Sequence, residues 1–270
     1  MTIRKRKKSS SPLWSRDDDL LYALDPVIWA REVLGFHPDG WQQDLLRSRQ
    51  NKIILNCSRQ SGKSTTTAAL GLHECIYRRP TVGLCVAPGI RQSGELMQKF
   101  DEFRSAVELP SDYLDEDTKL SVKFKNKNRF MALPGSEKTI RGISAVTLLL
   151  EDEASRVLDV LYKSVRPMLA VSHGRHILMS TPFGKRGHFW EIWDRRRRGV
   201  SSNGKWQWFL VSADDCPRIT KEFLEDEKEE HGEQWYLQEY FNAFVDEETQ
   251  IFTRNSIMQA MDNDIAVIEI

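Results

Sequence analysis

Short apolar runs alternate along this chain with segments in which apolar residues recur at helical spacing. The runs predict buried strands, the first beginning at residue 52 and the others covering 81–87, 146–150, 175–180 and 206–211. The helical spacing predicts helices at 65–77, 90–107, 158–170, 187–198, 221–230 and 233–241. Strands that alternate with helices at these distances indicate an α/β fold with a mostly parallel sheet and helices on both faces.

Three further elements are predicted outside this alternation. Residues 17–36 have the pattern of one amphipathic helix, which Pro38 and Gly40 end, and residues 41–46 begin a second short helix. Residues 119–124 and 129–133 alternate apolar and polar positions and predict an antiparallel β-hairpin. We expect this hairpin to be an insertion that decorates the parallel core.

Charge and composition are those of an ordinary soluble globular protein. The 270 residues contain 39 basic and 39 acidic side chains, so a nucleic-acid partner would have to be held by local patches such as 195–198 or the basic run 3–8. No apolar run approaches membrane-spanning length, and the basic run is followed by Ser and Pro. We therefore expect an intracellular protein with no membrane partner. Its four cysteines show no paired short spacing, which favours reduced, mostly buried thiols.

The first chemical signal lies in the turn between the first strand and the helix after it. In a P-loop, backbone N–H groups and a helix N-terminus face a phosphate chain, a Lys reaches the β and γ oxygens, and the next hydroxyl holds Mg²⁺. Lys63 and Ser64 fit these two roles, although Cys57 stands where the strict motif has Gly. The alternative is a plain strand-to-helix turn with one exposed Lys. The predicted phosphate-binding residues are Ser58, Arg59, Gln60, Ser61, Gly62, Lys63, Ser64 and Thr65.

The second signal is an acidic run at the end of the strand at 146–150. The carboxyl ends of strands in open α/β sheets are where ligands bind, and hydrolysis of a phosphate chain needs one carboxylate on the Mg²⁺ side and one to activate water. We assign Asp152 to the metal and Glu153 to the catalytic base. Because three acids are adjacent, Glu151 and Asp152 could form the pair instead, and an acidic turn without function is the remaining alternative.

These motifs, in this order, resemble those of tailed-phage large terminases. The loop with Arg59 resembles the variant Walker A of that family, and the acidic strand end resembles its Walker B. The resemblance runs from about residue 25 to 252. Further matches are Trp41-Gln42, Leu133-Pro134-Gly135, Ile140-Arg141-Gly142, Met179-Ser180-Thr181-Pro182 followed by Gly184, and Gly187-His188-Phe189-Trp190.

The resemblance implies a P-loop NTPase of the additional-strand, conserved-glutamate (RecA-like) type, with ATP and Mg²⁺ as cofactors. Such a protein is a motor ATPase that drives double-stranded DNA into the procapsid. The implied partners are DNA, the portal protein and the small terminase subunit, with a homo-oligomeric ring when assembled and a monomer in isolation. The implied location is the cytoplasm of a bacterial host, with transient docking on the procapsid.

The resemblance also implies roles for single residues. Gln42 reads the adenine, and Arg59 contacts the γ-phosphate from the same subunit. The segment that couples hydrolysis to movement is Ser180, Thr181 and Pro182. The alternatives are that Gln42 faces solvent, that Arg59 pairs with an acid, and that the Thr-Pro pair only ends a strand.

Arg141 lies between the hairpin and the Walker B strand, and Gly142 beside it allows the loop to turn sharply. In the resembling family this loop supplies a catalytic arginine finger to the neighbouring subunit. The alternative is a surface Arg that binds DNA or an acid.

The implied domain organisation is a flexible basic arm at 1–16, an ATPase domain at 17–245 and a linker at 246–270. Large terminases also carry a C-terminal nuclease domain, which we do not find in this sequence, so we expect no DNA cleavage by this chain. A helicase-like DNA translocase is the first functional alternative, although 17–245 leaves no room for a second RecA-like domain. A nucleotide-binding switch without hydrolysis is the second, and Glu153 argues against it because a switch needs no base. A small-molecule kinase is a weaker third.

Overall fold

A computed structural model describes residues 16–78, 80–107, 109, 113–134, 140, 142–198 and 206–245. Its centre is an eight-stranded sheet in the order β3-β4-β5-β2-β6-β7-β1-β8. The six strands from β5 to β8 in this order are parallel, and β4 and β3 extend the sheet antiparallel. The strands are β1 (Lys52–Cys57), β2 (Val82–Ala87), β3 (Leu114–Thr118), β4 (Ser121–Phe124), β5 (Arg129–Pro134), β6 (Leu148–Asp152), β7 (Arg175–Ser180) and β8 (Gln207–Val211).

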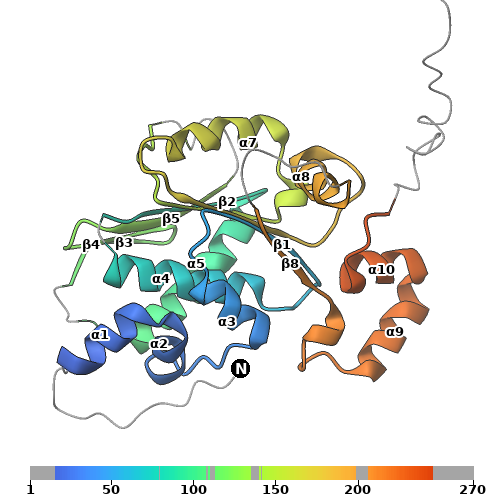
Figure 1. Ribbon diagram of the computed structural model, residues 1–270, viewed down its shortest axis with the longest axis horizontal. Helices are drawn as coiled ribbons and strands as arrows, with labels where there is room; N and C mark the ends of the chain where they lie inside the picture. Colours follow the sequence, from blue (N-terminus) through green and yellow to red (C-terminus); the bar gives the residue numbers. More distant parts are fainter. Residues whose placement is uncertain are drawn as a thin grey trace, which may run out of the picture.

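Helices cover both faces of this sheet, as predicted (Figure 1). One layer is α1 (Arg16–Leu24), α2 (Pro26–Glu32), α3 (Gly40–Arg47), α4 (Lys63–Tyr77) and α5 (Ile90–Ala106), and the other is α7 (Asp159–Val165) and α8 (Gly187–Arg197). Two further helices, α9 (Lys221–His231) and α10 (Glu233–Phe241), lie beside the β8 edge. Short 3₁₀ turns are η1 (Ala154–Arg156), η2 (Arg166–Leu169) and η3 (Ala213–Asp215).

The buried strands supply apolar side chains to both layers because successive residues of a strand point to opposite faces. Ile53 and Leu55 of β1 belong to the core beneath α2, α3, α4 and α5, whereas Ile54 packs with Phe189 of α8 on the other face. Leu84 and Val86 of β2 pack with α7 in the same way. This explains why the runs are continuously apolar rather than alternating.

The predicted single helix at 17–36 is wrong, because the chain breaks at Asp25. Its carboxylate caps α2 by accepting hydrogen bonds from the backbone N–H of Val27 at 2.9 Å and of Ile28 at 3.4 Å. Pro26 follows as the first helical residue, where its missing N–H costs nothing. The predicted helix at 158–170 is also too long, since a turn of 3₁₀ helix that contains Pro167 replaces its second half.

The predicted hairpin forms between β4 and β5, but it is not a separate insertion. Its second strand pairs parallel with β2 and belongs to the central sheet. β3, with the polar sequence Leu114-Asp115-Glu116-Asp117-Thr118, was not predicted, because four of its five side chains are exposed and carry no apolar signal.

All four cysteines are buried and free, in agreement with the expectation from their spacing. Within the described ranges, none of the helices has the length and apolar content needed to cross a membrane.

Candidate active site

The turn from β1 to α4 has the geometry of a phosphate-binding loop. Gly62 caps the helix in the left-handed region, with φ +93°, and a Cβ there would come within 2.7 Å of Gln42 Nε2. The left-handed backbone favours glycine here, and a side chain would in addition displace the amide of Gln42. Helix α4 begins at Lys63, so its first backbone N–H groups, which have no partner within the helix, surround the place expected for a phosphate.

The rest of the loop is anchored to neighbouring elements. The backbone N–H of Ser58 donates to Val211 of β8 and that of Arg59 to Glu239 of α10, both at 2.7 Å. Gln60 also has a positive φ, +57°. Ser61 is fully buried, and its hydroxyl has no hydrogen-bond partner among the residues that the structure describes. A tethered loop with one unpaired buried hydroxyl is suited to a polar ligand.

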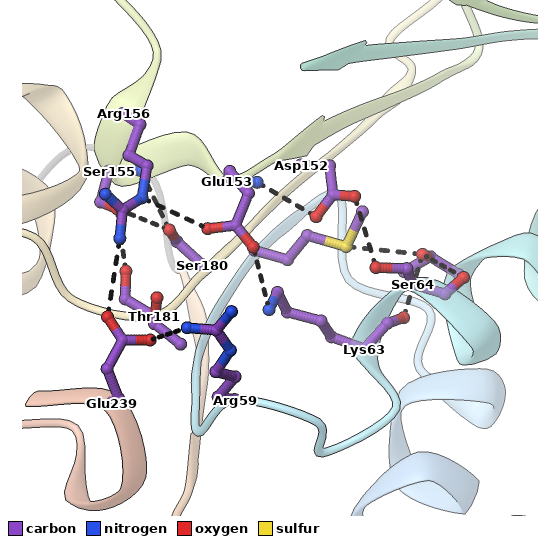
Figure 2. A network of polar contacts seen from close by, with 12 residues as sticks. Arg59, Lys63, Ser64, Asp152, Glu153, Ser155, Arg156, Ser180, Thr181 and Glu239 are labelled. Atoms are coloured by element: carbon purple, nitrogen blue, oxygen red, sulfur yellow. Dashed lines mark hydrogen bonds and ion pairs between the residues drawn. The ribbon is translucent and has the colours of Figure 1, made fainter. Parts of the chain in front are cut away.

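Two contacts join this loop to the end of β6, although β7 lies between β1 and β6 in the sheet. Lys63 Nζ lies 3.1 Å from Glu153 Oε1, and Ser64 Oγ donates to Asp152 Oδ2 at 3.3 Å (Figure 2). Thr65 follows in the first turn of α4 and is half-buried. The structure thus brings together the cation, the hydroxyl and the two carboxylates that the sequence singled out.

Burial changes the proton affinity of these groups. Burial of Lys63 favours the neutral amine, but Glu153 and Asp152 outweigh this and hold the pKa of Lys63 above its ordinary value. Burial raises the pKa of Asp152 to about 6, with Lys63 opposing the rise and Glu153 adding to it. Two carboxylates close to one another and to one ammonium are a common arrangement in sites that bind charged ligands.

Ser64 and Asp152 fit a Mg²⁺ ion in chemistry as well as position. Mg²⁺ takes oxygen ligands, keeps several waters, and is usually held by one or two protein groups together with substrate phosphates. The part of the chain that the structure describes contains no cluster of three or more His, Cys, Asp or Glu side chains that could hold a metal by itself. The oxygens of Ser64 and Asp152 could therefore hold a Mg²⁺ ion together with the oxygens of a bound phosphate chain.

Glu151 and Glu153 have different surroundings. Glu151 is fully buried and lies 2.7 Å from Nε2 of His176 and 3.1 Å from Nε2 of His188, away from the loop. Glu153 has a left-handed backbone, with φ +51°, which breaks the strand alternation and places its side chain at Lys63. This geometry favours Glu153 over Glu151 as the base.

Gln42 is buried at 1% exposure, so the alternative that it faces solvent is wrong. Its amide nitrogen donates to the carbonyl of Ser61 at 3.3 Å, and its carbonyl accepts from the backbone N–H of Asp39 at 2.8 Å. Arg218, which the sequence did not single out, pairs with Asp39 at 2.6 Å and donates to the same Ser61 carbonyl at 3.4 Å. The contact of Gln42 with the loop is observed, while its role toward adenine stays a prediction.

Arg59 pairs with an acid, as one alternative proposed. Its guanidinium is half-exposed and lies 3.7 Å from Glu239 Oε2 of α10. Arg156, two residues after the η1 start, lies 3.6 Å from the other oxygen of Glu239 and 3.9 Å from Glu153. The sequence patterns did not identify Glu239 or Arg156 as site residues. Glu239 is distant in the chain from both arginines that it contacts, and no local pattern indicates such a contact.

The segment after β7 is tied to the turn that follows Glu153. The backbone N–H of Ser155 donates to Ser180 Oγ at 3.2 Å, and its hydroxyl donates to the carbonyl of Thr181 at 2.8 Å (Figure 2). Thr181 and Pro182 are buried. The segment predicted to couple hydrolysis to movement therefore contacts the turn that directly follows the acidic strand end. Arg141 lies outside the described residues, and its neighbour Gly142 is exposed with φ +96°.

Comparison with known proteins identifies the family. The family model described as "Terminase large subunit, T4likevirus-type, N-terminal" matches residues 54–259, which include the whole loop, the acidic strand end and α10. The chain belongs to this terminase family. The resemblance found in the sequence is thus confirmed, and β7, between β1 and β6, is the additional strand that it implied.

The proteins similar to this chain include terminases of three phages. The large subunit of Thermus phage G20c is 23% identical over 172 residues, which cover 57% of this chain and 35% of that protein. The ATPase domain of the Thermus phage P74-26 large terminase covers 82% of this chain and 100% of that domain, with a TM-score of 0.65 and 21% identity. The large terminase of a thermophilic bacteriophage, solved in complex with ATP-gamma-S, covers 83% of this chain and 52% of that chain, with a TM-score of 0.53 and 16% identity. The predicted fold class is therefore confirmed, while the match spans only about a third of the curated relative's length.

Proposed function

We propose that this terminase segment is a motor ATPase that hydrolyses ATP with Mg²⁺ and drives double-stranded DNA into a phage procapsid. The pair of contacts from Lys63 to Glu153 and from Ser64 to Asp152 is the observation that carries the proposal. The thermophilic bacteriophage terminase in complex with ATP-gamma-S supports nucleotide binding by this fold. ATP hydrolysis is assigned to residues 17–245, with the basic arm at 1–16 and the linker at 246–270 outside it. DNA cleavage is not part of the proposal.

Each site residue has one task in this scheme. Lys63 and Arg59 bind the terminal phosphates, and Ser64 and Asp152 hold Mg²⁺, which neutralises phosphate charge. Lys63 and Glu153 form an ion pair at 3.1 Å. When Lys63 is attracted to a bound phosphate, this ion pair weakens. Glu153 can then accept the proton of the attacking water.

The assembled form completes the proposal. Copies of the chain form a ring on the portal protein, with the small terminase subunit and DNA as further partners, in the host cytoplasm. Arg141 of one copy acts on the ATP of its neighbour. Ser180, Thr181 and Pro182 transmit hydrolysis to movement. The hydrogen bonds of Ser180 and Thr181 with Ser155, two residues after Glu153, support that role.

Substitution of Lys63 tests the proposal. Lys63→Ala should weaken ATP binding and abolish phosphate release, because it removes the cation at the phosphates. Lys221→Ala, which removes the same side chain from an exposed position on α9, is the matched control and should turn over normally. Phosphate release would be measured with and without portal and DNA. A Lys63→Ala protein with full turnover contradicts the site. ATP binding without any phosphate release in the wild type favours the switch, and strand separation without packaging favours the helicase-like translocase.

A further inference from the structure

Five charged side chains form a chain of alternating sign that begins and ends in the phosphate-binding loop (Figure 2). Lys63 contacts Glu153 at 3.1 Å, Glu153 contacts Arg156 at 3.9 Å, and Arg156 contacts Glu239 at 3.6 Å. Glu239 then contacts Arg59 at 3.7 Å, four residues before Lys63. The two cations predicted to bind phosphates are therefore both engaged by carboxylates of the protein.

Glu239 is the central member of this chain. Its side chain is 5% exposed, and its two carboxylate oxygens face two different arginines. Its backbone carbonyl also accepts from the backbone N–H of Arg59 at 2.7 Å, and Asn56 donates to the carbonyl of Asn242 at 3.3 Å. These bonds fix the end of α10 against the loop and hold the carboxylate within reach of Arg59.

Arg156 provides a partner that does not depend on Arg59. Its guanidinium lies 4.1 Å above the ring of Phe183, a cation–π contact that keeps it beside Glu239. A buried carboxylate that lost every partner would be costly, but Glu239 keeps Arg156, and the Gln238 side-chain amide at 3.4 Å, when Arg59 turns away. Arg59 is half-exposed and free to do so at modest cost.

We propose that Glu239 is a positioning residue that competes with the terminal phosphate of ATP for Arg59 and so sets the preference of the site for triphosphate over diphosphate. The inference rests on the proposed function. ATP must draw the guanidinium away from Glu239, whereas ADP has no γ-phosphate and leaves this ion pair intact. Glu239 thereby weakens ATP binding selectively and returns Arg59 to α10 after hydrolysis.

The test compares affinities for ATP-γ-S and ADP with Mg²⁺, measured by calorimetry on the full chain. Glu239→Gln keeps the shape of the side chain but removes its charge, so ATP-γ-S should bind about 2- to 5-fold more tightly, the range for a half-exposed ion pair, with ADP unchanged. Glu233→Gln is the matched control, because it removes one charge from the exposed side of the same helix and should change neither affinity.

A double-mutant cycle makes the test specific. In an Arg59→Gln background, Glu239→Gln should no longer change ATP-γ-S affinity. Equal changes for both nucleotides, or an effect that survives without Arg59, would overturn the inference. If Glu239→Gln does not fold, Glu239→Asp keeps the charge but shortens the reach to both arginines, and a selective gain in ATP-γ-S affinity is expected there as well. A wild type that binds neither nucleotide would refute the proposed function itself, whereas normal binding with an unchanged ratio in the variants refutes only the inference.

Discussion

Glu151 and Glu153 differ by two positions but have opposite electrostatic tasks. Glu151 is enclosed by two imidazoles, and although burial alone would raise its pKa, hydrogen bonds from His176 and His188 lower it to about 2. Glu153 is a quarter exposed and contacts the loop cation. The sequence identified the acidic run but did not predict the direction in which each acidic side chain points. That direction depends on the left-handed backbone at Glu153, a conformation that Glu rarely adopts.

Glu153→Gln should retain ATP binding while turnover falls by roughly 10²- to 10⁴-fold, the usual effect of losing a general base. The amide has the same shape and still contacts Lys63, so the phosphate-binding loop should be preserved. Binding of ATP-γ-S and release of phosphate would be measured on the same preparation. Glu151→Gln is the comparison, and it should lower thermal stability. If it instead folds normally, binds ATP and loses turnover, the catalytic base is Glu151 and the assignment shifts by two residues.

At the scale of elements, a buried polar cluster joins β6, β7, α7 and α8 behind the site. His188 has a carboxylate oxygen 3.1 Å from each ring nitrogen, one from Glu151 and one from Asp159. Both nitrogens can donate only in the protonated ring. Burial lowers the pKa of His188, but Glu151 and Asp159 outweigh burial and raise it above its ordinary value. Tyr162 stacks on this ring with centroids 4.1 Å apart.

This cluster predicts a pH window for stability. The pKa of His188 is raised on folding, so its contribution is fully present below about pH 6.5 and is lost as pH rises through the folded value. Glu151 behaves oppositely, and its contribution is lost as pH falls below about 4.5 toward 2. The difference in unfolding free energy between wild type and His188→Gln should therefore be larger at about pH 5.5 than at about pH 9. Urea denaturation at both pH values measures this difference, and His37→Gln, at an exposed position, is the control. A difference that does not depend on pH would contradict a protonated His188 ring.

The sequence predicted most elements but not every boundary or long-range contact. β7 and α10 occur where the patterns placed them, because a strand buried on both faces leaves a continuous apolar run and a helix leaves apolar residues at helical spacing. The Asp25–Pro26 break was missed because the helical spacing of apolar residues continues across it. The position of Glu239 beside Arg59 depends on how the chain returns to the loop after β8, and local patterns contain no information on that path.

At the scale of the whole molecule, the parallel strands β1, β7 and β6 end at the same edge of the sheet, next to the phosphate-binding loop. Arg141 lies outside the described residues. Of its two chain neighbours, Ile140 is buried, and a Cβ added to exposed Gly142 would have no described atom within 4 Å. The resemblance to large terminases implies that Arg141 serves the ATP of a neighbouring copy, and this role stays a prediction.

A role of Arg141 in the neighbouring subunit can be tested only in assembled protein. Arg141→Ala should bind ATP normally and hydrolyse poorly, because a guanidinium at the transferring phosphoryl is worth roughly 10³- to 10⁵-fold in rate. Lys63→Ala should fail for the complementary reason, since its loop cannot hold the phosphates. In a mixture, an interface between the two variants can pair an intact loop with an intact Arg141, so some turnover should return in assembled protein. Full activity of Arg141→Ala assemblies would exclude the finger, and loss without recovery on mixing would show that Arg141 acts on the ATP of its own subunit.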